Sequence, residues 1–88
     1  MPTNTTMKRH ADLVDRMATT LGIDLEEKML EGLIMPDGVC DAVLNCTGCA
    51  NPDDCDGWLK AQVAPVDSVP DGCRNAEMFK RLKAGKPA

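Results

Sequence analysis

The chain has 88 residues, of which 43% are hydrophobic but only 2% aromatic, and its net charge is −4. A chain of this length forms one domain that buries only about 60% of its unfolded surface, so its apolar core is marginal without further stabilisation. The acidic balance argues against a surface that follows nucleic-acid phosphates. The scarcity of aromatic residues favours helices over sheets, because Leu, Met and Ala are good helix formers.

The first predicted helix has the clearest pattern in the chain. Thr5 or Thr6 can cap it, and Gly22 should end it. Apolar residues recur at a spacing of three and four and define the face that we expect to be buried. These residues are Met7, Ala11, Val14, Ala18 and Leu21. His10, the only histidine, stands among polar neighbours, so we expect it to be exposed rather than to act as a ligand or a base.

A second helix should follow and pair with the first as a helical hairpin over residues 5–35. Asp24, with Glu27 three positions later, resembles a capping box, and Pro36 should stop the helix. Its expected buried residues are Leu25, Met29, Leu30, Leu33 and Ile34. The hairpin would form the first half of a single domain, residues 1–88.

Residues 37–84 should form the second, cysteine-rich helical half. A short third helix, which Asp37 can cap, leads to a turn that contains Cys46 and Cys49. Its apolar residues are Val39, Val43 and Leu44. The close pair of cysteines therefore follows a helix rather than a strand.

A fourth helix should present Cys55 in its first turn, with Asp54 as the cap. Cys55 and Trp58 lie on one face of this helix, so the thiol and the indole point the same way. Leu59 and Gln62 share that face. A connector bounded by Pro65 and Pro70 follows and is too short to be a domain linker.

A last helix, which Asp71 can cap, should carry Cys73 in its first turn. Its shared face comprises Cys73, Ala76, Phe79 and Leu82. Cys73 would then repeat the placement of Cys55 at a helix start, where the helix dipole favours the thiolate that binds metal. Basic residues near the end of this helix complement the opposite end of the dipole. They are Lys80, Arg81, Lys83 and Lys86.

Four cysteines have the spacing of metal ligands, Cys-x2-Cys-x5-Cys-x17-Cys. They are Cys46, Cys49, Cys55 and Cys73. A two-residue spacer that holds Gly48 lets the backbone curl until the first two sulfurs face one centre. We expect at least three of the four to bind a metal or an iron–sulfur cluster, with Trp58 and Phe79 shielding it from water. The alternative is that the cysteines are free or disulfide-bonded and pack as small apolar residues.

The identity of the centre is a choice between zinc and a 4Fe–4S cluster, because both accept four thiolates. Zinc favours paired knuckles, and only one close pair exists here. The run Cys40-x5-Cys46-x2-Cys49-x5-Cys55 resembles, one residue short in its first gap, the Cys-x6-Cys-x2-Cys-x5-Cys cluster loop of the helical DNA glycosylases. The catalytic lysine and glycine motif of those enzymes have no counterpart here, so no glycosylase activity is implied. We favour the 4Fe–4S cluster over zinc, with Cys40 as a rival to Cys73 for the fourth position.

A second resemblance covers more of the chain. Three motifs occur in order: Cys46-Thr47-Gly48-Cys49, Cys55-Asp56-Gly57-Trp58-Leu59 and Cys73-Arg74-Asn75-Ala76. Together with the helix end at Gly22-Ile23-Asp24, they look like the pattern of an uncharacterised family of short alphaproteobacterial proteins, a domain of unknown function. Arg74 replaces the proline that usually follows the last cysteine in that pattern. The resemblance implies that Cys73 belongs with the other three cysteines and that Cys40 is peripheral, and it implies no activity.

Several other functions lack the residues they need. Ala50 follows the close pair where covalent haem attachment requires histidine, and thioredoxin-like chemistry would need a strand before the pair. No acid, base and nucleophile set converges, so we do not expect an enzyme. The sequence opens without a charged region followed by an apolar core, and no apolar run approaches membrane-spanning length. We therefore expect a cytoplasmic protein, although a trimmed leader would restore the disulfide interpretation.

The sequence thus predicts an all-α fold of four to five short helices in a compact bundle, clasped by a cysteine-ligated metal or iron–sulfur centre. The expected function is that of a small metal-binding protein with a structural, redox-sensing or regulatory role through a protein partner. One alternative is an electron-transfer protein with an acidic docking face, and another is a structural zinc-binding module. We expect neither nucleic acid nor a membrane as a partner.

Overall fold

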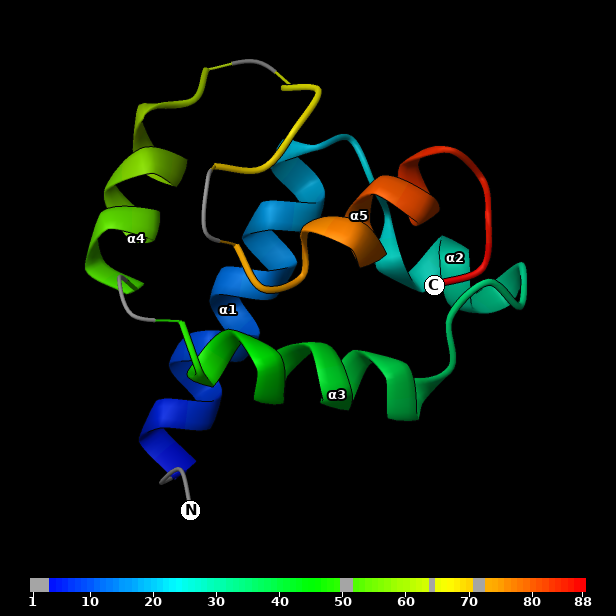
Figure 1. Ribbon diagram of the computed structural model, residues 1–88, viewed down its shortest axis with the longest axis horizontal. Helices are drawn as coiled ribbons and strands as arrows, with labels where there is room; N and C mark the ends of the chain where they lie inside the picture. Colours follow the sequence, from blue (N-terminus) through cyan, green and yellow to red (C-terminus); the bar gives the residue numbers. More distant parts are fainter. Residues whose placement is uncertain (1–3, 50–51, 64, 71–72) are drawn as a thin grey trace.

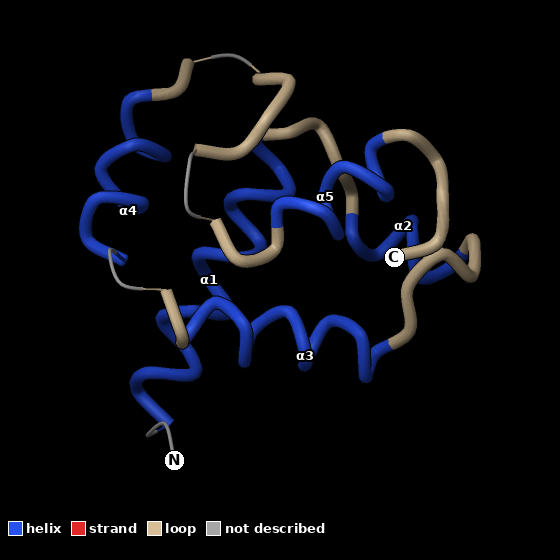
Figure 2. Tube along the Cα trace, viewed as in Figure 1, coloured by secondary structure: helices blue, strands red, loops and turns tan. Residues whose placement is uncertain are grey.

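The computed structural model describes residues 4–49, 52–63, 65–70 and 73–88. Every regular element in these ranges is a helix (Figure 2). The helices are α1 (Asn4–Thr20), α2 (Leu25–Leu30), α3 (Pro36–Thr47), α4 (Pro52–Ala61) and α5 (Ala76–Lys83). The prediction of a compact all-α fold is therefore confirmed. None of these helices, within the described ranges, has the length and apolar character that crossing a membrane requires.

α1 is the helix around which the others are arranged (Figure 1). It packs most extensively against α3 and next against α4. The sequence predicts that the first two helices pair as a hairpin, but α2 is only 6 residues long and the main partner of α1 is α3. α3 has 12 residues, twice the length of α2, and crosses α1 (Figure 1).

The buried face of α1 overlaps the predicted face but differs from it at several positions. Val14, Ala18 and Leu21 are at most 3% exposed, as expected, and they are joined by Leu13 and Met17. Ala11 is exposed, which contradicts the prediction that it belongs to this face. Thr5 and Thr6 lie inside α1, so the prediction that either is its cap is also wrong.

α2 begins as predicted and ends earlier than predicted. Asp24 is its N-cap, and the Asp24 carboxylate accepts a hydrogen bond of 3.2 Å from the backbone N–H of Glu27. The chain then leaves the helix through Gly32, whose φ of +77° favours glycine. Leu30 is 84% exposed because it lies in the last turn before this change of direction, so its predicted burial is wrong. Ile34, beyond the turn, is buried as predicted.

α3 starts where the sequence predicts that α2 stops. Pro36 occupies the first turn of α3, and Met35 rather than Asp37 is the N-cap. This position suits proline, because the first N–H groups of a helix have no partner within the helix. Asp37 lies in the first turn, where its carboxylate complements the helix dipole. Val43 is buried as expected, whereas Leu44 is 49% exposed.

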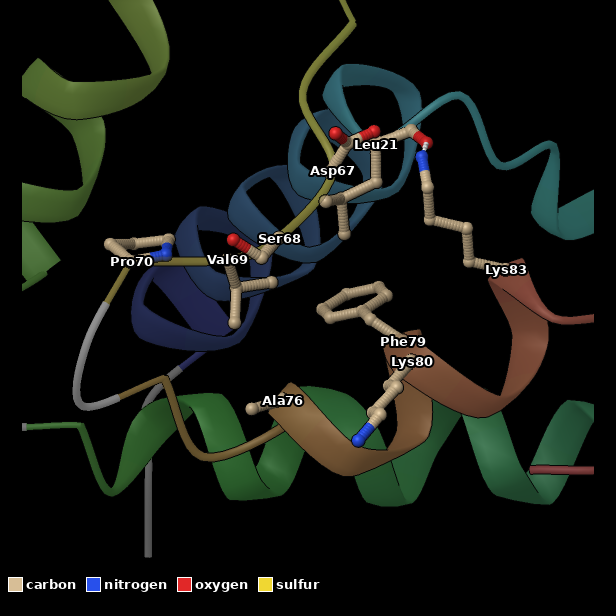
Figure 3. Close-up of a pocket in the computed structure, with 9 residues that line it drawn as sticks. All are labelled: Leu21, Asp67, Ser68, Val69, Pro70, Ala76, Phe79, Lys80 and Lys83. Atoms are coloured by element: carbon tan, nitrogen blue, oxygen red, sulfur yellow. Dashed lines mark hydrogen bonds between the residues drawn. The ribbon is translucent and has the colours of Figure 1, made fainter.

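The C-terminal end of α1 is tied to α5 and to the connector. The Lys83 ammonium donates hydrogen bonds to the main-chain oxygens of Leu21, at 2.5 Å, and Val66, at 3.2 Å. Val66 in turn donates its backbone N–H to Thr20 at 2.9 Å. Figure 3 shows Phe79 and Leu21 beside these contacts, around a cavity of about 450 Å³. The connector is therefore part of the packed structure.

Candidate metal centre

The four predicted ligands line one cavity of about 440 Å³. We call Cys46, Cys49, Cys55 and Cys73 the cavity cysteines. They come from the end of α3, the residues that follow it, α4 and the turn before α5, which gather around α1 (Figure 1). Apolar side chains form much of the remaining wall, and they include both predicted shielding aromatics. These side chains are Leu13, Val14, Met17, Pro52, Trp58, Pro70 and Phe79.

Cys40 is placed apart from the cavity cysteines. It lies on α3 with its side chain exposed and does not line the cavity, whereas each cavity cysteine is half-buried. All five cysteines lie within the described ranges and are free thiols. The structure therefore brings Cys46, Cys49, Cys55 and Cys73 to one cavity and places Cys40 outside it.

The turn that joins Cys46 to Cys49 continues α3 with ordinary helical geometry. Gly48 has a φ of −83°, so the turn does not need the conformational freedom of glycine that the sequence suggests. The Arg74 guanidinium instead donates a hydrogen bond of 2.8 Å from Nε to the Gly48 oxygen. A Cβ at Gly48 would stand only 3.3 Å from that Nε. Glycine therefore leaves room for Arg74 to tie the last cysteine motif to the first.

Cys55 lies in the fourth position of α4, because the helix begins at Pro52. Asp54 is inside the first turn, so the prediction that it is the N-cap is wrong. Cys55 and Trp58 both line the cavity, as their shared helical face predicts. The Cys55 thiol and the Trp58 indole therefore face the same cavity, as predicted, whereas α4 starts earlier than predicted.

Ion pairs hold α4 against α1. Arg9 pairs with Asp53, and the Arg16 guanidinium contacts the Asp56 carboxylate at 2.6 Å. The hydrogen bond from Arg16 is the main reason that the pKa of Asp56 lies below its usual value. Arg16 is also close enough to Cys55 for its positive charge to oppose the rise in the pKa of that thiol. These pairs fix the helix that carries the third cavity cysteine.

Cys73 lies before α5 rather than in its first turn, which contradicts the predicted helix start. The helix begins at Ala76 with Asn75 as its N-cap, and the predicted cap at Asp71 lies outside the described residues. Asn75 is only 4% exposed, and its amide donates a hydrogen bond of 2.8 Å to the main-chain oxygen of Ala42. This bond fastens the turn that holds Cys73 to the middle of α3.

Burial and mutual repulsion raise the thiol pKa values in the cavity. Burial is the main cause for Cys46, followed by the charges of the other three cavity cysteines, and together they raise its pKa from 9.0 to about 11. The pKa values of Cys55 and Cys73 are also raised, again mainly by burial. This direction is opposite to the predicted stabilisation of thiolates by helix dipoles. Without a metal these thiols are therefore protonated at neutral pH, and binding a metal would release their protons.

His10 was missed by the sequence analysis as a residue of this site. It is 5% exposed, not solvent-exposed as predicted, and its Nδ1 lies 3.1 Å from the Cys46 Sγ. The pattern of the first helix contains a signal for this placement. Positions 7, 10, 14, 17 and 21 continue the three-and-four spacing through His10 at least as well as through Ala11.

The side chains around the cavity do not form a preformed site for a single metal ion. In residues 4–49, 52–63, 65–70 and 73–88, no group of three or more His, Cys, Asp and Glu side chains is arranged to hold a metal ion. The cavity cysteines therefore share a space without converging on a single point.

Comparisons with known proteins give a family and no activity. Neither the curated proteins nor the solved structures contained a match to the chain. A family model described as a family of unknown function (DUF6455) matches residues 1–85. This match confirms the resemblance to an uncharacterised family that the three cysteine motifs suggest. The chain belongs to the family of unknown function DUF6455.

Proposed function

We propose that the chain binds a metal centre through the four cavity cysteines, and that this centre is a 4Fe–4S cluster in preference to zinc. We propose further that the centre has a structural or redox-sensing role through a protein partner. One observation carries the proposal: four half-buried free thiols from separate segments line one cavity, while the fifth thiol, Cys40, is exposed elsewhere.

The surroundings of the sulfurs suit bound thiolates. The backbone N–H of Asn75 donates a hydrogen bond to Cys73, and the charge of Arg16 favours the ionised form of Cys55. Such partners stabilise negative charge on sulfur when a metal replaces the thiol proton. Apolar side chains such as Trp58 and Phe79 line the same cavity and limit the access of water.

The size and spread of the cavity favour a cluster over a single ion. Zinc holds its thiolates at about 2.3 Å in tetrahedral geometry, which puts two sulfurs only about 3.8 Å apart. The cavity cysteines are not gathered in such a group, and they surround about 440 Å³. In a 4Fe–4S cluster each thiolate binds a different iron, so the four sulfurs stand farther apart.

Anaerobic reconstitution tests the proposal directly. The full chain would be incubated with ferrous iron and sulfide, desalted and assayed for iron, for sulfide and for absorption near 400 nm. A parallel sample would receive zinc. We expect about four iron and four sulfide per chain and a brown colour. Stoichiometric zinc without iron uptake would select the structural zinc module, and no uptake of either metal would refute the proposal.

Cysteine variants then identify the ligands. Single Cys→Ser changes at the cavity cysteines should each abolish or sharply lower the metal content. The matched control is Cys40→Ser, which removes a thiol from the same helix that carries Cys46 and should retain the centre. If Cys40→Ser loses the centre and Cys73→Ser keeps it, the glycosylase-like set of ligands is correct instead.

Electron transfer is the second candidate function, and exposed acidic residues beside the cavity favour it. Asp54 is exposed in the first turn of α4, next to Cys55, and so is Asp53, which pairs with Arg9. Such carboxylates can form a docking face for a basic partner, whose association would weaken with added salt. Voltammetry separates the two roles. A reversible wave with an unchanged far-ultraviolet spectrum supports an electron carrier, whereas loss of the centre on oxidation supports a structural or sensing role.

A further inference from the structure

His10 is the one imidazole in the chain, and it is held against a proposed ligand. It belongs to the buried face of α1, and the contact from its Nδ1 to the Cys46 Sγ, at 3.1 Å, is within hydrogen-bond distance for sulfur. The side chain is 5% exposed, so this contact is largely shielded from competing water. A histidine in this position must either share a proton with the sulfur or bind the centre itself.

The state of Cys46 decides which atom carries the shared proton. A thiol can donate its S–H to Nδ1 or accept from it, so the metal-free protein has two ways to form the contact. When Cys46 binds a metal, its thiol proton leaves to solvent and the sulfur can only accept. The contact then persists only if the imidazole carries its hydrogen on Nδ1.

We propose that His10 is a positioning residue of the centre, which donates its Nδ1–H to the ligated sulfur of Cys46 and raises the reduction potential of the centre. The inference rests on the proposed function. A hydrogen bond to a ligating sulfur withdraws negative charge from the cluster, and it stabilises the reduced form more than the oxidised form because the reduced form is more negative. If a cluster is bound, reduction at an electrode would supply it with one electron, and His10 would keep its hydrogen on Nδ1 in both oxidation states.

The test compares two substitutions of His10 with the wild-type protein. His10→Asn keeps an N–H donor near the position of Nδ1, whereas His10→Leu removes the donor and retains an apolar side chain. Both reconstituted variants should contain as much iron as the wild type. The midpoint potential should fall in His10→Leu and stay closer to the wild-type value in His10→Asn. Leu21→Val, a change in a buried residue that directly follows α1 and does not line the cavity of the cysteines, should leave the potential unchanged.

Two outcomes would overturn the inference. Equal potentials in the wild type and His10→Leu, at full iron content, would show that the contact does not tune the centre. Loss of iron in both His10 variants, with far-ultraviolet spectra like that of the wild type, would identify His10 as a ligand. Uptake by the wild type is measured first, so failure of the proposed function is seen before the variants are compared.

The tautomer of His10 gives a second readout that needs no variant. The zinc-loaded protein is diamagnetic, and its single histidine gives one pair of ring nitrogen signals in a ¹⁵N spectrum. We expect the hydrogen on Nδ1 in this form. A hydrogen on Nε2 alone would leave Nδ1 without a proton to donate and would refute the inference.

Discussion

The two ends of α1 are stabilised in different ways. At the apolar end, which comprises Leu21, Ile23, Phe79 and Leu82, each side chain is at most 4% exposed, and Lys83 bonds to nearby main-chain oxygens. At the sulfur end, which comprises His10 and the cavity cysteines, α1 faces half-buried thiols around a cavity. The first end is stabilised by apolar burial and by the hydrogen bonds of Lys83. The second resembles a site that gains its remaining contacts from a bound centre.

Removal of the proposed metal centre should have the largest effect and should distinguish the two ends. A structural zinc site in a small peptide contributes roughly 10–16 kcal/mol, and this becomes folding free energy where the site exists only in the folded state. We expect α4 and the turn at Cys73 to lose hydrogen-exchange protection first when a reconstituted sample is stripped with a chelator. The amides around Leu21 should stay protected longer. Equal loss of hydrogen-exchange protection at both ends would show that the two ends of α1 are not stabilised in different ways.

A cavity made in the apolar end should have the next largest effect. Leu82 is 0% exposed, and Leu82→Ala should lower the free energy of unfolding by about 2–5 kcal/mol because it leaves an unfilled space. Urea denaturation of the metal-free protein would measure the loss. The matched control is Leu30→Ala, at a residue that is 84% exposed, which should change stability by less than about 0.5 kcal/mol. Similar losses of unfolding free energy in Leu82→Ala and Leu30→Ala would show that Leu82 does not belong to a packed apolar core.

Asn75→Ala should have a smaller effect, concentrated at the sulfur end. The change removes the side-chain hydrogen bond to the main-chain oxygen of Ala42, which should cost about 1 kcal/mol because that oxygen keeps its helical partner. It should also weaken metal binding, because Asn75 fastens the turn that holds Cys73. Asn45→Ala removes only the 3.4 Å hydrogen bond from the Asn45 Nδ2 to the Asn75 Oδ1 and leaves the bond to Ala42 in place, so its effect should be smaller. A drop in stability with unchanged metal affinity would show that the turn holds its position without this bond.

Alkaline pH should have the smallest effect. Because folding raises the pKa of Cys46 from 9.0 to about 11, the folded metal-free protein binds this proton more tightly than the unfolded chain. The resulting stability is fully present below pH 9 and should be lost as pH rises to about 11. Denaturation curves across this interval would show a steeper decline in the parent protein than in Cys46→Ser. Cys40→Ser should decline like the parent, and parallel curves for all three would refute the prediction.

Much of the fold was predictable because local patterns determine it. The Asp24 cap and the apolar spacing of α1 depend on neighbours in sequence, and the structure retains both. The boundary between α2 and α3 was not predictable in the same way, because Pro36 is compatible with stopping one helix or starting another. The choice depends on how Ile34 and Val43 reach the core, which is a property of the packed structure.

The candidate site was predictable in its sulfurs and not in its other partners. Cysteine spacing left Cys40 as a rival to Cys73, and the family resemblance implied that Cys73 belongs with the other three. The structure places the four cavity cysteines around one cavity and leaves Cys40 exposed. His10 was assigned to the surface because its neighbours in sequence are polar, although the helical period also fits a buried position. The contact from Asn75 to Ala42 joins residues that are 33 positions apart, and no local pattern encodes it.

That long-range contact also bears on the order in which the cavity assembles. Closing a longer loop costs more entropy, and contacts between distant residues are slow to form. Cys46, Cys49 and Cys55 are joined by short segments and can meet before Asn75 docks on α3 and brings Cys73 into place. We therefore expect metal uptake by the unfolded chain to be biphasic, with a rapid step at three thiolates and a slower step that completes the site. In stopped-flow measurements, Asn75→Ala should slow only the second phase.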